Sequence, residues 1–232
     1  MTAANAMQNR ESLVKDFRIT TQLYEDGMAD LILNFKGSGK GSLEIELSLC
    51  GEVVLHKSSI LSEQSEIHSI IENVKCWSAE TPVLYDLVIT VVNNRKSLSE
   101  RIQRKVGFGY VEMKNGAMFL NGKRLRLAAA DDIELSAFED TLRENLSELK
   151  KNRINTVKIS NMTELEKVSG ICDEIGMYIL PEPDLCHVTE MYMTAKNHVS
   201  VIAWAVGESS EAKKAESIGL LKKLDDTRPV LA

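Results

Sequence analysis

The stretch VEMKNGAMFLNGK, residues 111–123, decides the fold. It contains two Asn-Gly pairs, Asn115-Gly116 and Asn121-Gly122. Asn and Gly readily take the positive φ angles that two-residue hairpin turns require, so the first pair predicts a β-hairpin. The hydrophobic pattern has a period of two residues before this stretch and a different period after it. The hairpin therefore predicts a boundary between two domains near residue 110.

Residues 13–110 are predicted to form an immunoglobulin-like β-sandwich. Apolar and polar residues alternate there, as they do in strands that are buried on one face. About five to seven short strands separated by turn residues are typical of an antiparallel sandwich. The clearest segments are 14–19, 29–35, 42–49, 83–91 and 101–108. Residues 1–12 show no such pattern and are expected to form a disordered tail.

Residues 111–232 are predicted to form an α/β domain, a partial (half) TIM barrel of about four βα units. Successive strand–helix units in one sheet make a parallel sheet with right-handed crossovers. We expect Thr163 to be the N-cap of the second helix, with Glu166 completing a capping box and Gly176 ending the helix. The expected strands are 125–130, 156–160, 177–180, 199–206 and a strand beginning at 230, and the expected helices are 138–151, 163–174, 190–197 and 210–224.

Bulk properties exclude some classes of function. The chain has 232 residues and a formal net charge of -6, which argues against non-specific nucleic-acid binding because that requires a basic surface. No run of about 18 apolar residues predicts a membrane helix, and residues 1–12 lack the apolar core of a signal peptide. We expect a soluble chain, either cytosolic or an excised piece of an exported protein, so the compartment stays undetermined.

The chain has four cysteines, Cys50, Cys76, Cys172 and Cys186. They form no CxxC pair and fit no metal-site spacing. Each stands in or near an apolar run, so buried free thiols are expected, which favours a reducing compartment slightly. No metal and no cofactor are predicted.

An ordered set of motifs resembles glycoside hydrolase family 2, the family of β-galactosidases, β-glucuronidases and β-mannosidases. Each motif is short, but they follow one another in the order of that family over roughly residues 75–230. The resemblance supports the sandwich and the barrel and does not by itself establish activity. The matching segments are CWSAETPVLY at 76–85, VGF at 106–108 with NGK at 121–123, LKKNRINTVK at 149–158, CDEIGMYI at 172–179 and DDTRPV at 225–230.

The resemblance implies where the chemistry of such an enzyme would lie. In that family the catalytic acid/base belongs to an Asn-Glu pair after the fourth barrel strand, in a segment similar to WAVGESS at 204–210. Aligned without a gap, Glu208 stands at the asparagine position and Ser209 at the glutamate position. A one-residue deletion returns Glu208 to the acid position but leaves the asparagine missing. The family's nucleophile follows the seventh strand, beyond the last residue of this sequence. We therefore predict no confident catalytic residue.

Other residues could bind a ligand at the same end of the strands. The candidates are Asp131, Asp132, Glu182, Asp184 and Trp204. The carboxylates are either ordinary loop residues or part of a cation site or polar cleft. Trp204 and Trp77 could stack on a sugar ring, although both are more typical of a core. Glu208 itself could be a solvated carboxylate near the start of the next helix. For His187 and His198 the spacing indicates no catalytic pairing.

Three classes of function remain open. The first is a catalytically inactive, family-2-like module that binds carbohydrate or has a structural or interaction role. The second is a truncated fragment of an active retaining β-glycosidase that hydrolyses O-glycosidic bonds. The third is a sensor or protein-interaction domain. Half a barrel leaves strand edges and apolar interior uncovered, so we also expect a homodimer or another partner at the open barrel edge.

Overall fold

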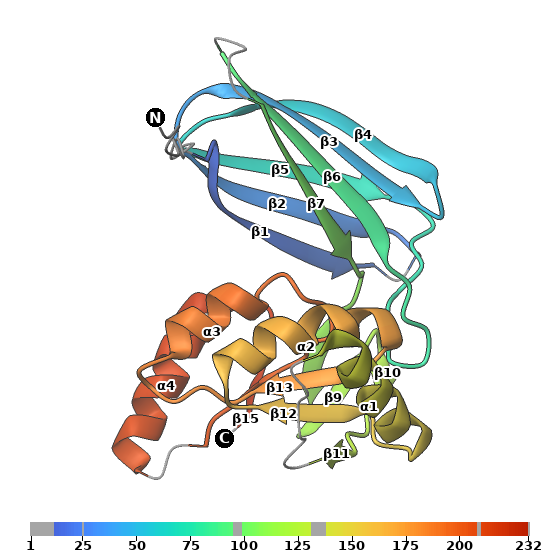
Figure 1. The fold of residues 1–232 in the computed structure, drawn as a ribbon, viewed down its shortest axis with the longest axis vertical. Helices are drawn as coiled ribbons and strands as arrows, with labels where there is room; N and C mark the ends of the chain where they lie inside the picture. Colours follow the sequence, from blue (N-terminus) through green and yellow to red (C-terminus); the bar gives the residue numbers. More distant parts are fainter. Residues whose placement is uncertain (1–11, 25, 95–98, 131–137, 208–209, 232) are drawn as a thin grey trace, which may run out of the picture.

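The computed structural model has two bodies arranged along the long axis of the molecule, a β-sandwich and an α/β part (Figure 1). It describes residues 12–24, 26–94, 99–130, 138–207 and 210–231. The predicted tail, residues 1–12, lies almost entirely outside the described residues. Among the described helices, none is long and apolar enough to cross a membrane.

The sandwich consists of two antiparallel sheets, as the alternating pattern predicts. The three-stranded sheet has the order β1 (Val14–Leu23), β2 (Ala29–Gly37) and β5 (Gln64–Ile71). The four-stranded sheet has the order β4 (Glu52–Leu61), β3 (Gly41–Leu49), β6 (Tyr85–Asn93) and β7 (Ser99–Val106). The predicted immunoglobulin-like sandwich is confirmed in its architecture.

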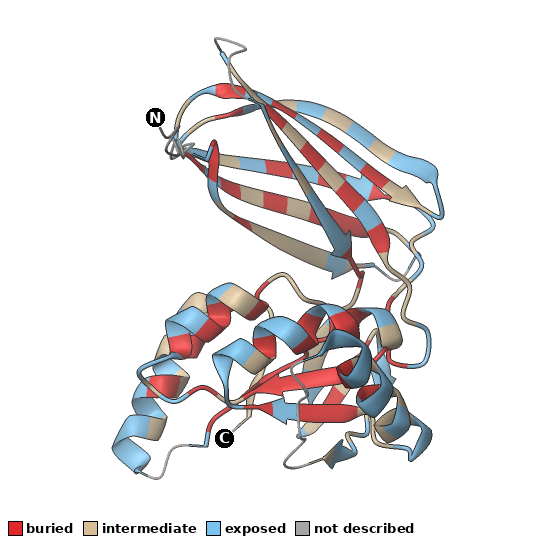
Figure 2. Cartoon of the chain, viewed as in Figure 1, coloured by how far each residue is buried: buried red, intermediate tan, exposed pale blue. Residues whose placement is uncertain are grey.

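The core of the sandwich lies between the inward faces of the two sheets. In β3, Leu43, Ile45 and Leu47 are fully buried, while the residues between them are exposed (Figure 2). Strands β4 and β5 were not among the clearest segments in the sequence. Strand β4 is an edge strand on which apolar residues such as Ile60 are exposed, so its hydrophobic pattern does not follow burial.

The hairpin predicted at residues 111–120 is confirmed. Strand β8 (Val111–Lys114) pairs with β9 (Ala117–Leu120), and β9 pairs in turn with β10 (Lys123–Arg124). Both Asn-Gly pairs have positive φ angles, 50° and 73° at Asn115-Gly116 and 52° and 75° at Asn121-Gly122. The left-handed conformations that these residues tolerate therefore form both turns.

The α/β part contains parallel strands and helices in alternation. Strands β11 (Ala129–Ala130), β12 (Thr156–Ile159) and β13 (Tyr178–Pro181) form one parallel sheet, and β14 (Trp204–Ala205) and β15 (Val230–Leu231) form another. An isolated parallel bridge between Ile179 of β13 and Val201, three residues before β14, links the two sheets in sequence. The helices are α1 (Glu139–Lys151), α2 (Met162–Ile175), α3 (Val188–Ala195) and α4 (Glu211–Leu224). This is the partial TIM barrel that the sequence predicts.

Alternate residues of the parallel strands pack on opposite faces. Val157 and Ile179 pack with the helices in one core. Tyr178 and Leu180 pack on the other face, in a core with Met118 of the β9 hairpin strand. The hairpin thus covers the inner face of the partial barrel.

Some local predictions differ from the structure. The strands expected at 125–130 and 199–206 are reduced to β11 and β14, because residues on either side make single bonds, such as the Leu125 N–H to the Met118 carbonyl, instead of a continuous ladder. The N-cap of α2 is Asn161, whose side chain accepts from the Thr163 and Glu164 amides. Gly176 ends the helix with φ 77°, as predicted.

The expected burial of the cysteines is correct only in part. All four thiols are free, but Cys172 is buried, Cys76 is half-buried, and Cys50 and Cys186 are exposed. Cys50 has φ 52° in the turn between β3 and β4, so it follows an apolar run without belonging to the core. An adjacent apolar run is therefore a weak indicator of burial at a turn.

Candidate functional site

Short segments follow the carboxyl ends of three parallel strands. Residues 160–161, 182–184 and 206–207 come after β12, β13 and β14, and we call them the carboxyl edge; its polar side chains are those of Ser160, Asn161, Glu182 and Asp184. In α/β barrels the active site is built at this end of the strands. The carboxyl edge is therefore the candidate site.

Glu182 is a predicted site residue that the structure places on the carboxyl edge, beside Gly207. It is half-buried, and its amide donates to the Ile159 carbonyl at 2.9 Å. Its carboxylate lies against Gly207, so close that a Cβ atom added to Gly207 would be 2.5 Å from Glu182 Oε1. The lack of a side chain at Gly207 thus leaves room for the Glu182 carboxylate.

Asp184 lies on the same edge but is engaged in a turn. Its Oδ1 accepts from the His187 amide at 3.0 Å and lies 2.7 Å from His187 Nδ1. The hydrogen bond from the His187 side chain is the main cause that lowers the pKa of Asp184 below its ordinary value. Both side chains are exposed, so the pair shapes the entry to α3 and contributes little stability.

Trp204 is a core residue. Its side chain is fully buried, its indole N–H donates to Asp225 Oδ2 at 2.9 Å, and its ring packs at 6.1 Å from that of Tyr192. The ring faces the helices, so in this arrangement it offers no surface to a sugar. Trp77 is also fully buried, and its indole N–H donates to the Asp173 carbonyl at 2.8 Å. The interpretation of both tryptophans as core residues agrees with this burial.

Four of the predicted site residues lie outside the described residues. They are Asp131, Asp132, Glu208 and Ser209. Their roles at the candidate site therefore stay predictions.

The other end of the parallel strands carries a second polar cluster. We call residues 196–201 and 225–229, which precede β14 and β15, the amino edge. His198 belongs to it: its Nδ1 lies 2.6 Å from Asp173 Oδ2, while Asp173 Oδ1 accepts from the Ser200 amide at 2.9 Å. His198 is thus positioned as a structural residue, away from the carboxyl edge.

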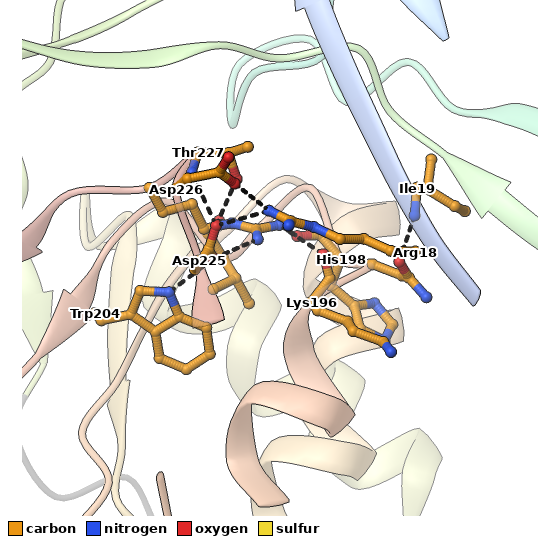
Figure 3. Close-up of polar contacts among 11 residues, drawn as sticks. Arg18, Ile19, Lys196, His198, Trp204, Asp225, Asp226 and Thr227 are labelled. Atoms are coloured by element: carbon orange, nitrogen blue, oxygen red, sulfur yellow. Dashed lines mark hydrogen bonds and ion pairs between the residues drawn. The ribbon is translucent and has the colours of Figure 1, made fainter. Parts of the chain in front are cut away.

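Asp225 is the centre of the amino edge (Figure 3). Its buried carboxylate accepts from the Trp204 indole, from Arg228 Nη1 at 2.9 Å and from Thr227 Oγ1 at 2.6 Å. Burial alone would raise the pKa of Asp225, but the Arg228 charge and these hydrogen bonds outweigh it and lower the pKa to about 2. The carboxylate is therefore ionised at every pH at which the protein is expected to work.

The amino edge also attaches the sandwich to the barrel. Arg18 Nη2, from β1, lies 3.2 Å from Asp225 Oδ1 and 2.9 Å from Asp226 Oδ1. The Asn197 side chain accepts from the Ile19 amide at 2.8 Å and donates to the Phe17 carbonyl at 3.1 Å. In the sequence, Asp225 stands out only as part of the family-like segment DDTRPV. The Asp-x-Thr pattern at 225–227 could have indicated a role for Asp225 in a turn, because an aspartate side chain often accepts a hydrogen bond from the backbone amide two positions later.

The described residues contain no group of three or more His, Cys, Asp or Glu side chains that could hold a metal ion. The Asp184 carboxylate is paired with His187, and the Glu182 carboxylate lies beside Gly207, where it can accept a hydrogen bond from a polar ligand.

Two family models match the chain. The model described as glycosyl hydrolases family 2 matches residues 12–108, and the model of the TIM barrel domain of that family matches residues 184–232. The first match covers the sandwich. The second covers the end of the α/β part, with helices α3 and α4, residues 184 and 206–207 of the carboxyl edge and the whole amino edge.

Similar proteins include bacterial β-galactosidases. The chain is 28% identical over 245 residues to a β-galactosidase of Streptococcus thermophilus, covering 82% of this chain and 24% of that protein. It is 27% identical over 260 residues to a β-galactosidase of Enterobacter cloacae, covering 99% of this chain and 25% of that protein. The chain thus spans about a quarter of the length of these relatives.

Solved structures share the fold at lower identity. A β-glucuronidase of Parabacteroides merdae superposes with a TM-score of 0.82 at 20% identity, over 94% of this chain and 33% of that one. β-Glucuronidase 3 of Bacteroides uniformis superposes with a TM-score of 0.79 at 22% identity, over 94% of this chain and 32% of that one. The sandwich, the partial barrel and both family models lead to one conclusion: the chain belongs to glycosyl hydrolases family 2.

Proposed function

We propose that this chain is a carbohydrate-binding module of its family that does not hydrolyse glycosides. The observation that carries the proposal is the composition of the carboxyl edge. Aligned without a gap, Glu208-Ser209 stands in place of the expected Asn-Glu pair, and with a one-residue deletion the asparagine is missing, while the Glu182 carboxylate lies beside Gly207. The edge thus offers a hydrogen-bonding carboxylate without the residue pair that the chemistry requires.

Hydrolysis with retention makes demands that binding does not. Two carboxyl groups about 5 Å apart are needed, one to protonate the leaving oxygen and one to attack the sugar. The Asp184 carboxylate has a lowered pKa and is bound to His187, so it accepts hydrogen bonds and is a poor proton donor. Glu182 can accept a hydrogen bond from a sugar hydroxyl. Sugar binding without bond cleavage is therefore the function that these groups support.

The relatives indicate the class of ligand. The similar proteins are named β-galactosidases and the similar structures β-glucuronidases. By analogy, we propose a β-linked galactoside or glucuronide as the ligand of the carboxyl edge.

Calorimetric titration tests this binding. Lactose, methyl β-galactoside, methyl β-glucuronide and methyl β-mannoside are titrated into the wild-type chain and into Glu182→Ala. We expect saturable binding of at least one galactoside or glucuronide, weakened about tenfold or more in Glu182→Ala because a charged hydrogen bond is lost. Glu44→Ala, an exposed position on β3, is the matched control and should bind as the wild type does. Absence of binding by all four sugars would refute the proposal.

A second candidate is that the chain forms one part of an active retaining β-glycosidase. The chain spans about a quarter of the length of the β-galactosidases to which it is similar, and this coverage favours the candidate. In that case Glu208, displaced by one position, is the acid, and the second carboxylate comes from the remainder of a longer protein. Release of nitrophenol from a β-galactoside only in the presence of that remainder would support this candidate over the first.

We also propose that a second copy of the chain, or another partner, covers the open edge of the partial barrel. Strands β11 and β15 stand at the ends of the two parallel sheets, and residues 125–129 next to β11 are exposed or half-buried. Light scattering at micromolar concentration tests a homodimer directly, and a monomer at every concentration would refute it. A glycan array then distinguishes carbohydrate binding from a sensor or protein-interaction role.

A further inference from the structure

A cleft of about 690 Å³ opens between the sandwich and the amino edge. Its lining includes Thr21 of β1 and Met113 of β8, together with Val199 from the amino edge. The cleft lies at the opposite end of the parallel strands from the carboxyl edge, so a ligand there would not occupy the proposed sugar site. A volume of this size is within the range of sites that hold small ligands or short peptide segments.

Two walls of the cleft are the free edges of β-sheets. Strand β1 stands at one end of the order β1-β2-β5, and β8 stands at one end of the order β10-β9-β8. Within the described part of the chain, β1 pairs with β2 and β8 with β9, and neither has a second strand neighbour. A free strand edge is a template for pairing with another extended segment.

The hydrogen bonds already present show which backbone groups of β1 face the cleft. The Ile19 amide and the Phe17 carbonyl point away from β2, because both bond the Asn197 side chain. Groups of alternate residues point the same way along a strand, so the Thr21 amide and carbonyl also face away from β2. The carboxamide of Asn197 is chemically a peptide group, and it already uses this edge as a neighbouring strand would.

The same reasoning applies to β8. Lys114 and Ala117 flank the two-residue turn and form a paired position of the hairpin. The backbone groups of Met113 and Val111 alternate with those of Lys114, so they point away from β9 and toward the cleft. Both residues line the cleft.

We propose that this cleft binds an extended segment of a partner protein by strand addition. Main-chain hydrogen bonds to the β1 and β8 edges supply the affinity, and pockets for alternate side chains supply the specificity. Val106, Leu120 and Val199 form an apolar part of the lining, which fits small apolar side chains at alternate positions of the segment. The charged lining residues Lys196, Asp226 and Arg228 are paired within this chain, with Asp16, Arg18 and Asp225. At the rim, Glu112 is paired with Lys114 at 2.7 Å, which fits a segment of low net charge.

Fluorescence anisotropy with a labelled model peptide tests the proposal. The probe is a fluorescein-labelled hexapeptide of alternating threonine and valine with blocked ends. We expect saturable binding to the full chain, weakened about five- to tenfold or more when every second backbone amide of the peptide is N-methylated, because each methyl group removes a main-chain donor. Amide shifts in NMR spectra should be confined to residues 17–23 and 110–114.

Two matched variants of the protein complete the test. Thr21→Pro removes the backbone donor at the free edge, where proline is tolerated, and should weaken peptide binding about fivefold or more. Thr21→Val keeps that donor and should bind as the wild type does. If Thr21→Pro does not fold, the N-methylated peptides decide. The proposal would be overturned if the methylated and unmethylated peptides bound equally, or if no peptide bound saturably. It would also be overturned if cellobiose displaced the peptide and abolished the amide shifts that the peptide causes, because the cleft would then be a saccharide site.

Discussion

The two ends of the parallel strands use polar residues in different ways. At the amino edge, the Asp225 carboxylate is buried and accepts hydrogen bonds from several donors at once. At the carboxyl edge, Asp184 is exposed and Glu182 is half-buried beside Gly207. Buried ionised groups are costly unless they are fully paired, whereas exposed ones can be changed with little effect on folding.

This difference separates motifs of the sequence that bear on the fold from motifs that bear on chemistry. The segment DDTRPV at 225–230 resembles the family's motif, and the Asp225 side chain within it bonds Trp204, Thr227 and Arg228. In the segment WAVGESS at 204–210, we predict that the family's Asn-Glu pair is not intact, either because Glu208-Ser209 replaces it or because the asparagine is missing. Similarity at the amino edge is thus evidence of the fold, and only the carboxyl edge bears on chemistry.

The comparison is tested most strongly by removing Asp225. We expect Asp225→Ala to reduce the free energy of unfolding by about 3–5 kcal/mol, because Arg228 and the Trp204 indole lose a buried partner. Asp226→Ala, whose side chain is 80% exposed, is the matched control and should cost less than about 1 kcal/mol. Urea unfolding followed by circular dichroism measures both. Equal losses would mean that the amino edge is not the structural centre of the barrel.

Acid should weaken the amino edge within a defined range of pH. The pKa of Asp225 is lowered from 3.8 to about 2 in the folded chain, so its contribution is complete above about pH 4 and is lost as the pH falls toward 2. The shift corresponds to about 2–3 kcal/mol of stability. Thermal unfolding at pH 5, 4, 3 and 2 should show a smaller acid-induced fall in Tm for Asp225→Ala than for the wild type. Parallel curves for the two proteins would contradict this assignment.

Arg18 tests the attachment of the sandwich to the amino edge. Arg18→Ala should lower the free energy of unfolding by about 1–2 kcal/mol, since charged hydrogen bonds to Asp225 and Asp226 are lost. The double variant with Asp225→Ala should lose less than the sum of the single losses, because the two side chains interact directly. Lys15→Ala, an exposed position on the same strand, serves as the control. Strict additivity would show that the contact contributes nothing.

The carboxyl edge should give the smallest effect on stability. Gly207→Ala places a Cβ atom against the Glu182 carboxylate, which is the end of a flexible side chain and can move, so we expect a loss of less than about 1 kcal/mol. In a Glu182→Ala background the same substitution should cost nothing. Thermal unfolding of the four proteins measures the coupling. If Gly207→Ala lowered the stability equally in both backgrounds, the Glu182 carboxylate would not lie against Gly207.

Local patterns in the sequence predicted much of the fold. Strand β3 alternates between buried and exposed residues, and the Asn115-Gly116 turn has the positive φ angles that its residue types favour. The cap of α2 was wrong by two positions, because Asn161 and Thr163 are both good capping residues and only the backbone geometry decides between them. Strand β4 has no clear alternating pattern in the sequence, because apolar residues such as Ile60 are exposed on this edge strand.

The candidate site was harder to predict than the fold. Glu182 was correctly expected at the ends of the strands, but its approach to Gly207 depends on how β13 and β14 lie side by side. The bond between Arg18 and Asp225 joins residues 207 positions apart, and no local pattern indicates such a pair. Contacts of this kind follow from tertiary packing, which short motifs do not encode.

The chain has the family's fold, and the central proposal is that it lacks the family's hydrolytic chemistry. The most direct test is the release of nitrophenol from the nitrophenyl β-galactoside, β-glucuronide and β-mannoside by the wild-type chain, Glu182→Gln and Glu208→Gln. We predict no release above the buffer blank from any of the three proteins. Turnover by the wild-type chain that is abolished by Glu208→Gln or Glu182→Gln would contradict the claim and identify the carboxyl edge as an active site.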